Sequence, residues 1–342
     1  MDKNEPIAER IPELILPNDG TLLDKVSTEA NLKSSEIGFV RPDEKTLLVV
    51  GSRGVGKTTL IVQTFNLNEE ITPTLALEYF FSTQMTEYDH HVCNIWELGG
   101  GTTFSPTLYA LEDMPNMTAV VMVDLSSPST LFNSAESSIK IINDFAEKRN
   151  DVDDLKKQAL DRVPDEHPDK KYLTPCPTQL VIIGGKYDAF QEFDPEPKRI
   201  ICSFLRFLAN KYYAHLVFYS NKNNNLITIT KNVLNHFAFG NELSGKVQLD
   251  HNYPLIVQPG KDSFQAIDSS DGPPYSTEKY KKLLDVHFSQ VPVKDKPIVE
   301  NPRFDSNFKE PTIDALRVEK DECLERLCQE LEMEMKVMGR AQ

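Results

Sequence analysis

Short apolar segments recur along the middle of the chain, and segments with helical spacing separate them. The apolar segments are rich in β-branched residues, as is typical of strands buried on both faces of a sheet. They lie at residues 45–50, 118–124, 179–184 and 215–220. The helix-like segments lie at residues 57–66, 129–148, 196–213 and 225–237. Strands that alternate with helices predict βαβ units, and hence a mostly parallel sheet with helices on both faces.

Two more strands and one more helix complete the predicted elements. Residues 77–85 and 91–98 read as strands joined closely enough to form a hairpin, which would add one antiparallel edge strand. That arrangement is the Ras-like α/β topology of P-loop NTPases. Near the C-terminus, residues 311–338 read as a helix with a narrow apolar stripe, because Leu324, Leu331 and Met338 are seven apart with Leu327 between them.

These patterns divide the chain into four parts. Residues 1–44 are polar and read as a flexible N-terminal segment, and residues 45–240 form the predicted Ras-like P-loop domain. Proline and glycine accumulate in residues 241–310, which read as an extended linker or partner-binding region, followed by the C-terminal helix within 311–342. Inside the domain, residues 150–177 form an acidic insertion, interpreted as a solvated surface excursion with an exposed helix over 151–158.

Composition narrows the class of partner. The chain has 342 residues and a formal net charge of −15, which argues against binding to nucleic acid and to the acidic surface of a microtubule. No apolar segment is long enough to cross a bilayer, and the first residues do not read as a signal peptide. The five scattered cysteines suit reduced thiols. We therefore expect a cytoplasmic protein.

The first site motif is Gly51-Ser-Arg-Gly-Val-Gly-Lys-Thr58, which fits the pattern G-x-x-x-x-G-K-[ST] between a strand and a helix. In that context backbone N–H groups wrap a phosphate, the lysine reaches the outer phosphates, and the threonine can hold Mg²⁺. A glycine turn without a ligand is the alternative. The predicted cofactor-binding residues of this loop are Gly51, Gly54, Val55, Gly56, Lys57, Thr58 and Thr59.

The second motif, Trp96-Glu-Leu-Gly-Gly-Gly101, resembles the W-D-x-x-G-Q segment of Ras and Arf proteins. There the aspartate steadies Mg²⁺ through water, the glycine donates its N–H to the γ-phosphate, and the glutamine orients the attacking water. Glu97 stands in the aspartate position, Gly100 in the glycine position, and Gly101 in the glutamine position. Thr72 and Thr74 lie where a switch threonine would sit, so Thr74 is a second, weak metal-ligand candidate after Thr58.

The third motif concerns the base. The sequence Gly185-Lys-Tyr-Asp188 resembles [NT]-K-x-D, in which the carboxylate accepts two hydrogen bonds from guanine while the lysine stem covers its face. Glycine replaces the leading asparagine. The sequence Ser220-Asn-Lys222 resembles the S-A-K loop that touches the base. The base-binding candidates are Lys186, Asp188, Ser220, Asn221 and Lys222.

These motifs predict binding without efficient catalysis. Orienting water and neutralising charge supply nearly all of phosphoryl-transfer catalysis, and an unassisted Ras-type site turns over at only about 10⁻⁴ per second. Without the glutamine, hydrolysis should be slower still. We expect GTP or GDP with Mg²⁺, held as a structural group, or an empty loop, and no catalytic residue. Arg53 could compensate in cis, although a loop arginine is usually solvated.

The motifs together resemble the dynein light intermediate chain family. The resemblance rests on the P-loop, on Thr74-Leu-Ala-Leu-Glu-Tyr79, on the Trp96 motif, and on Val181-Ile-Ile-Gly-Gly-Lys-Tyr-Asp188. Further similar segments are Lys198-Arg-Ile-Ile-Cys202, Leu205-Arg-Phe207, Phe237-Ala-Phe-Gly240 and Asp262-Ser-Phe264. The match covers about residues 45 to 268 and is strongest with the members that serve cytoplasmic dynein 2.

The resemblance implies a non-catalytic subunit that binds and stabilises the dynein 2 heavy chain beside the other motor subunits. It further implies indirect association with intraflagellar transport particles, retrograde transport and cilium assembly. The location it implies is the cytoplasm, the cytoskeleton and the cilium, including axoneme and basal body, without contact to membrane or nucleic acid. On this reading residues 241–310 are the candidate heavy-chain-binding region. Two alternatives remain, namely a regulatory Ras-like GTPase switch and a dynein 1 light intermediate chain that links cargo adaptors.

Overall fold

The computed structural model describes residues 43–85, 90–111, 114, 116–243, 245–268, 275–290 and 310–338. The flexible segment expected over residues 1–44 lies almost wholly outside the described residues. The chain divides into two compact units, of which one comprises residues 1–43 and 85–90 and is described only at Asp43, Met85 and His90. The fold and the sites below concern the other unit, residues 44–84 and 91–342, and the bounds of β1, β2 and β3 each extend one residue beyond it.

A seven-stranded sheet forms the centre of the domain, in the order β2-β3-β1-β4-β5-β6-β7. β1 pairs with β4, β4 with β5, and β5 with β6, all in parallel, and β7 closes the far edge antiparallel to β6. The strands are β1 (Asp43–Gly51), β2 (Leu77–Met85), β3 (His90–Leu98), β4 (Met117–Asp124), β5 (Gln179–Gly185), β6 (His215–Phe218) and β7 (Ile256–Val257). The predicted α/β class with a mostly parallel sheet is confirmed.

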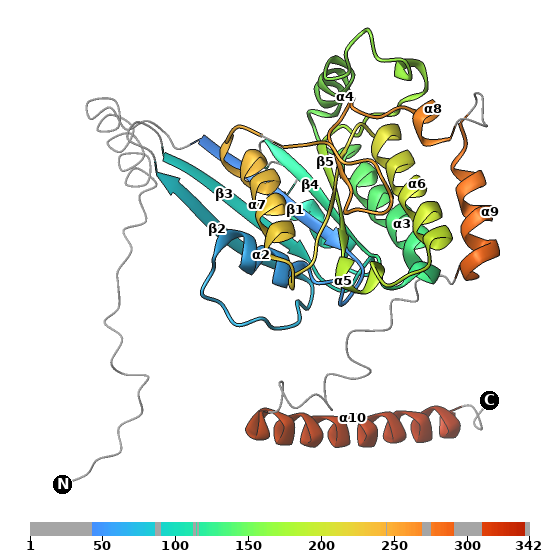
Figure 1. The fold of residues 1–342 in the computed structure, drawn as a ribbon. Coiled ribbons are helices and arrows are strands. Elements are labelled where there is room, and N and C mark those ends of the chain that lie inside the picture. Colours follow the sequence, from blue (N-terminus) through green and yellow to red (C-terminus); the bar gives the residue numbers. More distant parts are fainter. Residues whose placement is uncertain are drawn as a thin grey trace, which may run out of the picture. The chain divides into compact units, whose positions relative to one another are not determined.

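Helices cover both faces of the sheet (Figure 1). One core lies under α2 and α7 and contains Leu60, Val120 and Val233, and the other lies under α3, α6 and α9 and contains Val121, Phe132 and Phe204. The helices are α2 (Lys57–Phe65), α3 (Pro128–Ala146), α4 (Val152–Asp161), α5 (Tyr187–Phe190), α6 (Pro195–Lys211), α7 (Asn224–Phe239), α8 (Phe264–Ile267), α9 (Thr277–Phe288) and α10 (Pro311–Met338), with 3₁₀ turns η2 (Ser105–Leu111) and η3 (Lys170–Tyr172).

Local sequence explains where the main helices begin. Proline occupies the first position of α3 and of α6, where its missing N–H costs no helical hydrogen bond. Asn223 caps α7 by accepting from the N–H groups of Asn225 and Leu226, and Gly240 ends that helix with a φ of 77°. The strands and long helices predicted from the sequence begin and end within a few residues of the observed ones.

The sheet and its helical layers continue past the boundary expected at residue 240. β7 adds a strand beyond β6, and α9 packs against α3 and α6. Leu255, Phe264 and Leu284 are buried in the same core as the central strands. Where the sequence suggested a linker or partner-binding region over 241–310, the described residues 245–268 and 275–290 belong to the domain itself.

The acidic insertion is also less exposed than the solvated excursion that the sequence predicts. The observed α4 is exposed along most of its length, but Val163, Asp169 and Cys176 downstream of it are buried. The Asp169 carboxylate accepts from Asn210 Nδ2 at 2.7 Å and from the backbone N–H of Phe264 at 2.8 Å. The insertion thus links α6 to α8 through a buried carboxylate.

The C-terminal helix α10 spans Pro311–Met338, as the apolar stripe predicted. Its described side chains are exposed apart from the partly buried Asp314, and Leu324 and Leu327 are exposed by 59% and 50%. A search of the described helices finds none with the length and apolarity that a bilayer crossing requires.

Candidate nucleotide site

The P-loop runs from the end of β1 to the first residue of α2, at the carboxyl edge of the parallel strands. Gly54 and Gly56 adopt φ angles of 73° and 105°, which residues with a Cβ rarely adopt. At Gly51 a Cβ would lie 2.3 Å from the carbonyl oxygen of Met122, so only glycine fits. Val55 is buried in the loop, and Thr59 follows partly buried on α2. The backbone geometry is that of a phosphate cradle.

Lys57 and Thr58 both contact Glu97 from β3. The Lys57 ammonium donates to the carbonyls of Gly51 at 3.1 Å and Ser52 at 3.2 Å, and it lies 3.9 Å from Glu97 Oε1. The same carboxylate oxygen accepts from Thr58 Oγ1 at 3.1 Å. Lys57 and Glu97 are 5% and 2% exposed, so the loop holds a buried pair of opposite charges.

Burial shifts the proton affinities of this pair in opposite directions. Desolvation lowers the pKa of Lys57, against the attraction of Glu97, which raises it. Desolvation likewise raises the pKa of Glu97, against Lys57 and the Thr58 hydroxyl, which lower it. The second carboxylate oxygen, Oε2, is buried without a hydrogen-bond partner among the described residues. A buried acceptor of this kind is a suitable position for a cation or a water molecule.

The segment before β2 lies against the same group. Thr74 Oγ1 lies 3.4 Å from Thr58 Oγ1 and donates to Glu78 Oε2 at 2.7 Å. The N–H of Gly99 donates to the carbonyl of Ala76 at 2.6 Å, and a Cβ on Gly99 would lie 2.5 Å from the Thr74 carbonyl oxygen. Of the two threonine candidates, Thr74 therefore reaches the site, whereas Thr72 is exposed.

The remaining two glycines of this motif turn the chain away from β3. Gly100 and Gly101 are buried with φ angles of 65° and 68°. Gly101, in the position of the water-orienting glutamine, offers no side chain to a nucleophile. Arg53 is exposed on the loop.

The base-binding candidates come together at the ends of β5 and β6. Asp188 accepts from Ser220 Oγ at 2.8 Å and from Lys222 Nζ at 2.6 Å, and this pairing with Lys222 lowers the pKa of the carboxyl. Lys186, with a φ of 60°, donates to Asp124 Oδ2 at 2.6 Å. Asn221 is exposed between Ser220 and Lys222, on the loop that follows β6. The candidate residues thus form two neighbouring ion pairs beside the P-loop.

Because residue 185 is a glycine, the Met122 side chain fits beneath the P-loop. A Cβ at this position would lie 2.7 Å from the terminal methyl of Met122 and 3.4 Å from the Val55 carbonyl oxygen. The same methyl would lie 3.6 Å from a Cβ on Gly56. Met122 therefore fills space below the loop, next to the place where the family pattern of GTPases carries an asparagine.

Sequence reasoning missed two members of this site. Asp124 ends β4 and pairs with Lys186, and Met122 supports the loop from below. Both lie on the strand predicted at 118–124, and side chains at the carboxyl ends of neighbouring parallel strands meet at one edge. That rule would have identified Asp124, whereas a buried methionine carries no comparable signal.

The geometry fits a phosphate group better than it fits a metal in the Ras manner. The glycines of the loop leave the backbone N–H groups free of steric cover, which suits phosphate. Glu97, which is one methylene longer than aspartate, makes a direct hydrogen bond to Thr58, the residue that would hold Mg²⁺. Within the described part of the chain, no group of three His, Cys, Asp or Glu side chains has metal-binding geometry. Thr58, Thr74 and Glu97 are the residues that would surround a magnesium ion.

Fold and site together define a P-loop domain of the Ras-like type with altered switch and base motifs. A solved structure titled as the conserved domain of the dynein light intermediate chain has the same fold. It superposes with a TM-score of 0.54 and 15% identity, over 75% of this chain and 95% of that one. The family model described as dynein light intermediate chain (DLIC) matches residues 20–170.

Curated relatives agree with the family model. Cytoplasmic dynein 2 light intermediate chain 1 of Danio rerio is 31% identical over 310 residues, covering 83% of this chain and 86% of that protein. The Mus musculus protein of the same name is 32% identical over 305 residues, covering 82% and 87%. The chain belongs to the dynein light intermediate chain family.

Proposed function

We propose that the chain is a non-catalytic accessory subunit of cytoplasmic dynein 2 that binds and stabilises the heavy chain. The relatives that share most of its length carry that motor in their names, which favours dynein 2 over dynein 1. The work of such a subunit is retrograde intraflagellar transport and cilium assembly, in the cytoplasm, on the cytoskeleton and in the cilium. Its direct partners are the heavy chain and other motor subunits, and transport particles associate through them.

In this role the P-loop is a non-catalytic site that GTP or GDP can occupy and on which the heavy-chain contact does not depend. The observation that carries this is the Glu97 carboxylate, which satisfies Lys57 and Thr58 from within the protein. A loop whose key side chains already have partners keeps its shape with or without a ligand. Since Gly101 offers no side chain to orient water, hydrolysis is slower than the roughly 10⁻⁴ per second of an unassisted Ras-type site.

The decisive experiment replaces Lys57 in the full chain, co-expressed with a tagged dynein 2 heavy-chain tail. Lys57→Ala is expected to leave copurification with the tail unchanged and to remove any nucleotide that denatured wild-type protein releases. Lys156→Ala, at an exposed position of α4, is the matched control. Loss of tail binding in Lys57→Ala together with Ras-like phosphate release by the wild type would instead support a regulatory GTPase.

A further inference from the structure

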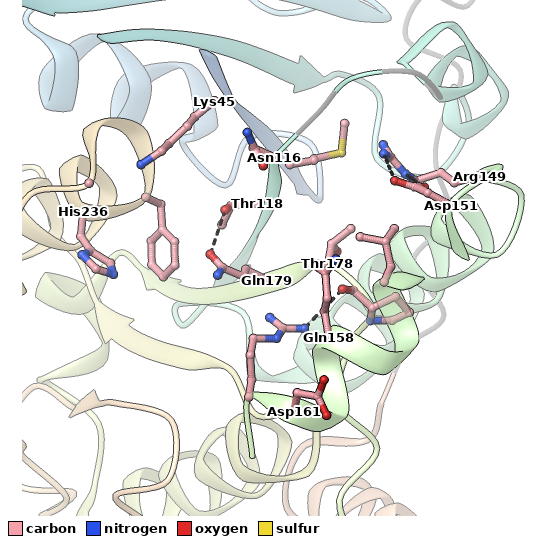
Figure 2. A pocket seen from close by; sticks show the side chains of 16 residues that line it. Lys45, Asn116, Thr118, Arg149, Asp151, Gln158, Asp161, Thr178, Gln179 and His236 are labelled. Carbon is pink, nitrogen blue, oxygen red and sulfur yellow. Dashed lines mark hydrogen bonds and ion pairs between the residues drawn. The ribbon is translucent and has the colours of Figure 1, made fainter. Parts of the chain in front are cut away.

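A cavity of about 760 Å³ is lined by the residues that Figure 2 shows. It opens at the amino-terminal ends of the strands, whereas the P-loop follows the carboxyl end of β1. Lys45 near the start of β1, Asn116 before β4, and Gln179 at the start of β5 line its sheet side. Ligand sites in proteins commonly measure about 300–1,000 Å³. The cavity is therefore of ligand size, and none of the residues discussed for the P-loop lines it.

The acidic insertion builds the opposite wall. Leu155, Gln158 and Asp161 are spaced at three-residue intervals on α4 and all line the cavity, and Arg162 follows directly. Spacing of this kind places side chains along one side of a helix. The exposed helix of the insertion thus has one side turned to solvent and the other to the cavity.

Basic side chains reach the cavity from four separate parts of the chain. Figure 2 shows Lys45 and His236 at one end and Arg149 with Asp151 at the other. Arg149 is neutralised there, because its guanidinium makes two hydrogen bonds to the Asp151 carboxylate, at 2.8 and 2.9 Å. The fourth basic residue, Arg162, has a different environment.

Arg162 is half-buried and pairs with carbonyl groups in place of an acid. Its Nη2 donates to the carbonyl oxygens of Cys176 at 2.7 Å and Pro177 at 3.3 Å. In the described part of the chain these carbonyls are its hydrogen-bond partners, and no carboxylate forms an ion pair with it. Burial without an anion lowers the pKa of this guanidinium. A smaller adjoining hollow of about 210 Å³ shares Arg162, Gln179 and His236 with the cavity.

We propose that this cavity binds a short acidic peptide segment of a partner protein, with one carboxylate on Arg162. A carboxylate that accepts from Nε or Nη1, while Nη2 stays on the two carbonyls, would supply the anion that the half-buried guanidinium lacks. Asn116 Oδ1 and Gln179 Nε2 can pair with a peptide backbone, whereas Asn116 Nδ2 already donates to the Glu44 carbonyl and Gln179 Oε1 already accepts from Thr118. Met117 and Phe237 provide apolar contact. Nucleic acid is the weaker candidate because its many phosphates need several basic groups, whereas Arg149 in this cavity is already paired with Asp151.

Methionine methyl NMR of the full chain tests the proposal, because one methionine lines the cavity and another lies under the P-loop. The probes are blocked tetrapeptides of sequence Leu-Glu-Glu-Leu and Leu-Gln-Gln-Leu, and sodium acetate at equal concentration. The acidic peptide is expected to shift the Met117 signal saturably and to leave Met122 unchanged. The glutamine peptide should bind about tenfold more weakly, as loss of one charge-assisted hydrogen bond implies.

Substitutions test whether Arg162 is responsible for the binding that shifts the Met117 signal. Arg162→Gln should weaken the acidic peptide about tenfold, whereas Arg199→Gln, an exposed arginine paired with Glu196 on α6, should leave it unchanged. Gln158→Glu adds a negative charge at an exposed position, keeps the carbonyl contacts of Arg162, and should also weaken binding. It keeps the test valid if Arg162→Gln does not fold.

The following outcomes would overturn the proposal. They are an unshifted Met117 signal up to millimolar acidic peptide, equal shifts from both peptides, and full binding by folded Arg162→Gln or Gln158→Glu. Acetate that shifts Met117 as strongly as the peptide at equal concentration would also reject a peptide site, in favour of a site for small anions.

Discussion

The Thr58 hydroxyl donates to the Glu97 carboxylate at 3.1 Å, directly across the mouth of the P-loop. In the Ras pattern the residue at this strand position contacts the metal through water and leaves the threonine to the ion. Here the longer side chain reaches the threonine itself. The length of the Glu97 side chain therefore affects whether the Thr58 hydroxyl is available to bind magnesium.

Shortening that side chain should strengthen magnesium-nucleotide binding. Glu97→Asp withdraws the carboxylate by one methylene and releases Thr58 from a hydrogen bond to a charged group. Such a bond contributes about 1.5 kcal/mol, so affinity for Mg²⁺·GDP should rise about tenfold. Titration with a fluorescent GDP analogue measures it, with the exposed Glu196→Asp as control. Equal or weaker affinity in Glu97→Asp would mean that the glutamate itself ligates the ion.

Restoring the asparagine of the guanine motif should strain the domain. Gly185→Asn places a Cβ 2.7 Å from the Met122 methyl, and this methionine is buried at 1% exposure, so it has little room to move aside. Overpacking of this kind costs about 1–3 kcal/mol of unfolding free energy. Met122→Val should relieve the clash, so the double variant should be more stable than the sum of the single changes predicts, by about 1 kcal/mol. Urea unfolding measures all three.

A glycine in open space provides the control for that experiment. A Cβ at Gly245 would meet only Gln258 Nε2, at 3.9 Å, so Gly245→Asn should change stability by less than about 0.5 kcal/mol. Strict additivity of Gly185→Asn and Met122→Val would show that the methionine does not oppose the asparagine.

A buried ion pair should prove essential to the region after residue 240. Arg206 on α6 makes two hydrogen bonds to the Asp262 carboxylate, at 2.7 and 2.8 Å, and the Asp262 side chain is 2% exposed. Asp262→Asn leaves the arginine charge uncompensated, at a cost of about 3–5 kcal/mol, or roughly 10 °C in melting temperature. Glu196→Gln, which breaks the exposed pair with Arg199, should cost less than about 1 kcal/mol. A separate low transition for Asp262→Asn, with the main transition unmoved, would show that residues 241–290 fold apart from the sheet.

Stability should fall on mild acidification because of one histidine. Burial beside His236 lowers the pKa of His215 to about 4. The unfolded chain, with a histidine pKa near 6.5, then binds more protons than the folded chain between about pH 6.5 and 4. Folded stability is therefore full above about pH 6.5 and declines by up to ~3 kcal/mol as pH falls towards 4.

Replacing the histidine should remove that part of the pH dependence. His215→Gln cannot titrate, so its unfolding free energy should vary less between pH 6.5 and 4.5 than that of the wild type. Chemical denaturation at half-unit pH steps measures both. Parallel pH profiles would show that His215 is charged in the folded protein.

The sequence predicted the P-loop, the central strands and the long helices well because each has a strong local signal. Gly51, Gly54 and Gly56 follow a fixed spacing, and β4 is a continuous apolar run. The region after residue 240 lacks such signals, since β7 has two residues and α8 has four. Their positions depend on packing against α6 and β6, which no local pattern records.

The residues of the candidate site can be named from the sequence, but their contacts with one another cannot. Glu97 was recognised as a replacement for aspartate, whereas its direct bond to Thr58 depends on where β3 lies relative to α2. The acidic insertion, residues 150–177, also depends on contacts that the sequence does not record. Its many charges predict exposed side chains, yet Asp169 is buried because Asn210 and Phe264, distant in sequence, donate hydrogen bonds to its carboxylate.

The N–H of Gly99 donates to the Ala76 carbonyl at 2.6 Å, and the Thr74 hydroxyl contacts the side chains of Thr58 and Glu78. In a molecular switch the segment before β2 must be released when the terminal phosphate leaves. In this domain hydrogen bonds within the protein hold that segment in place. Under the proposed accessory role, we expect a partner that packs on this face to meet the same surface whether or not a nucleotide is bound.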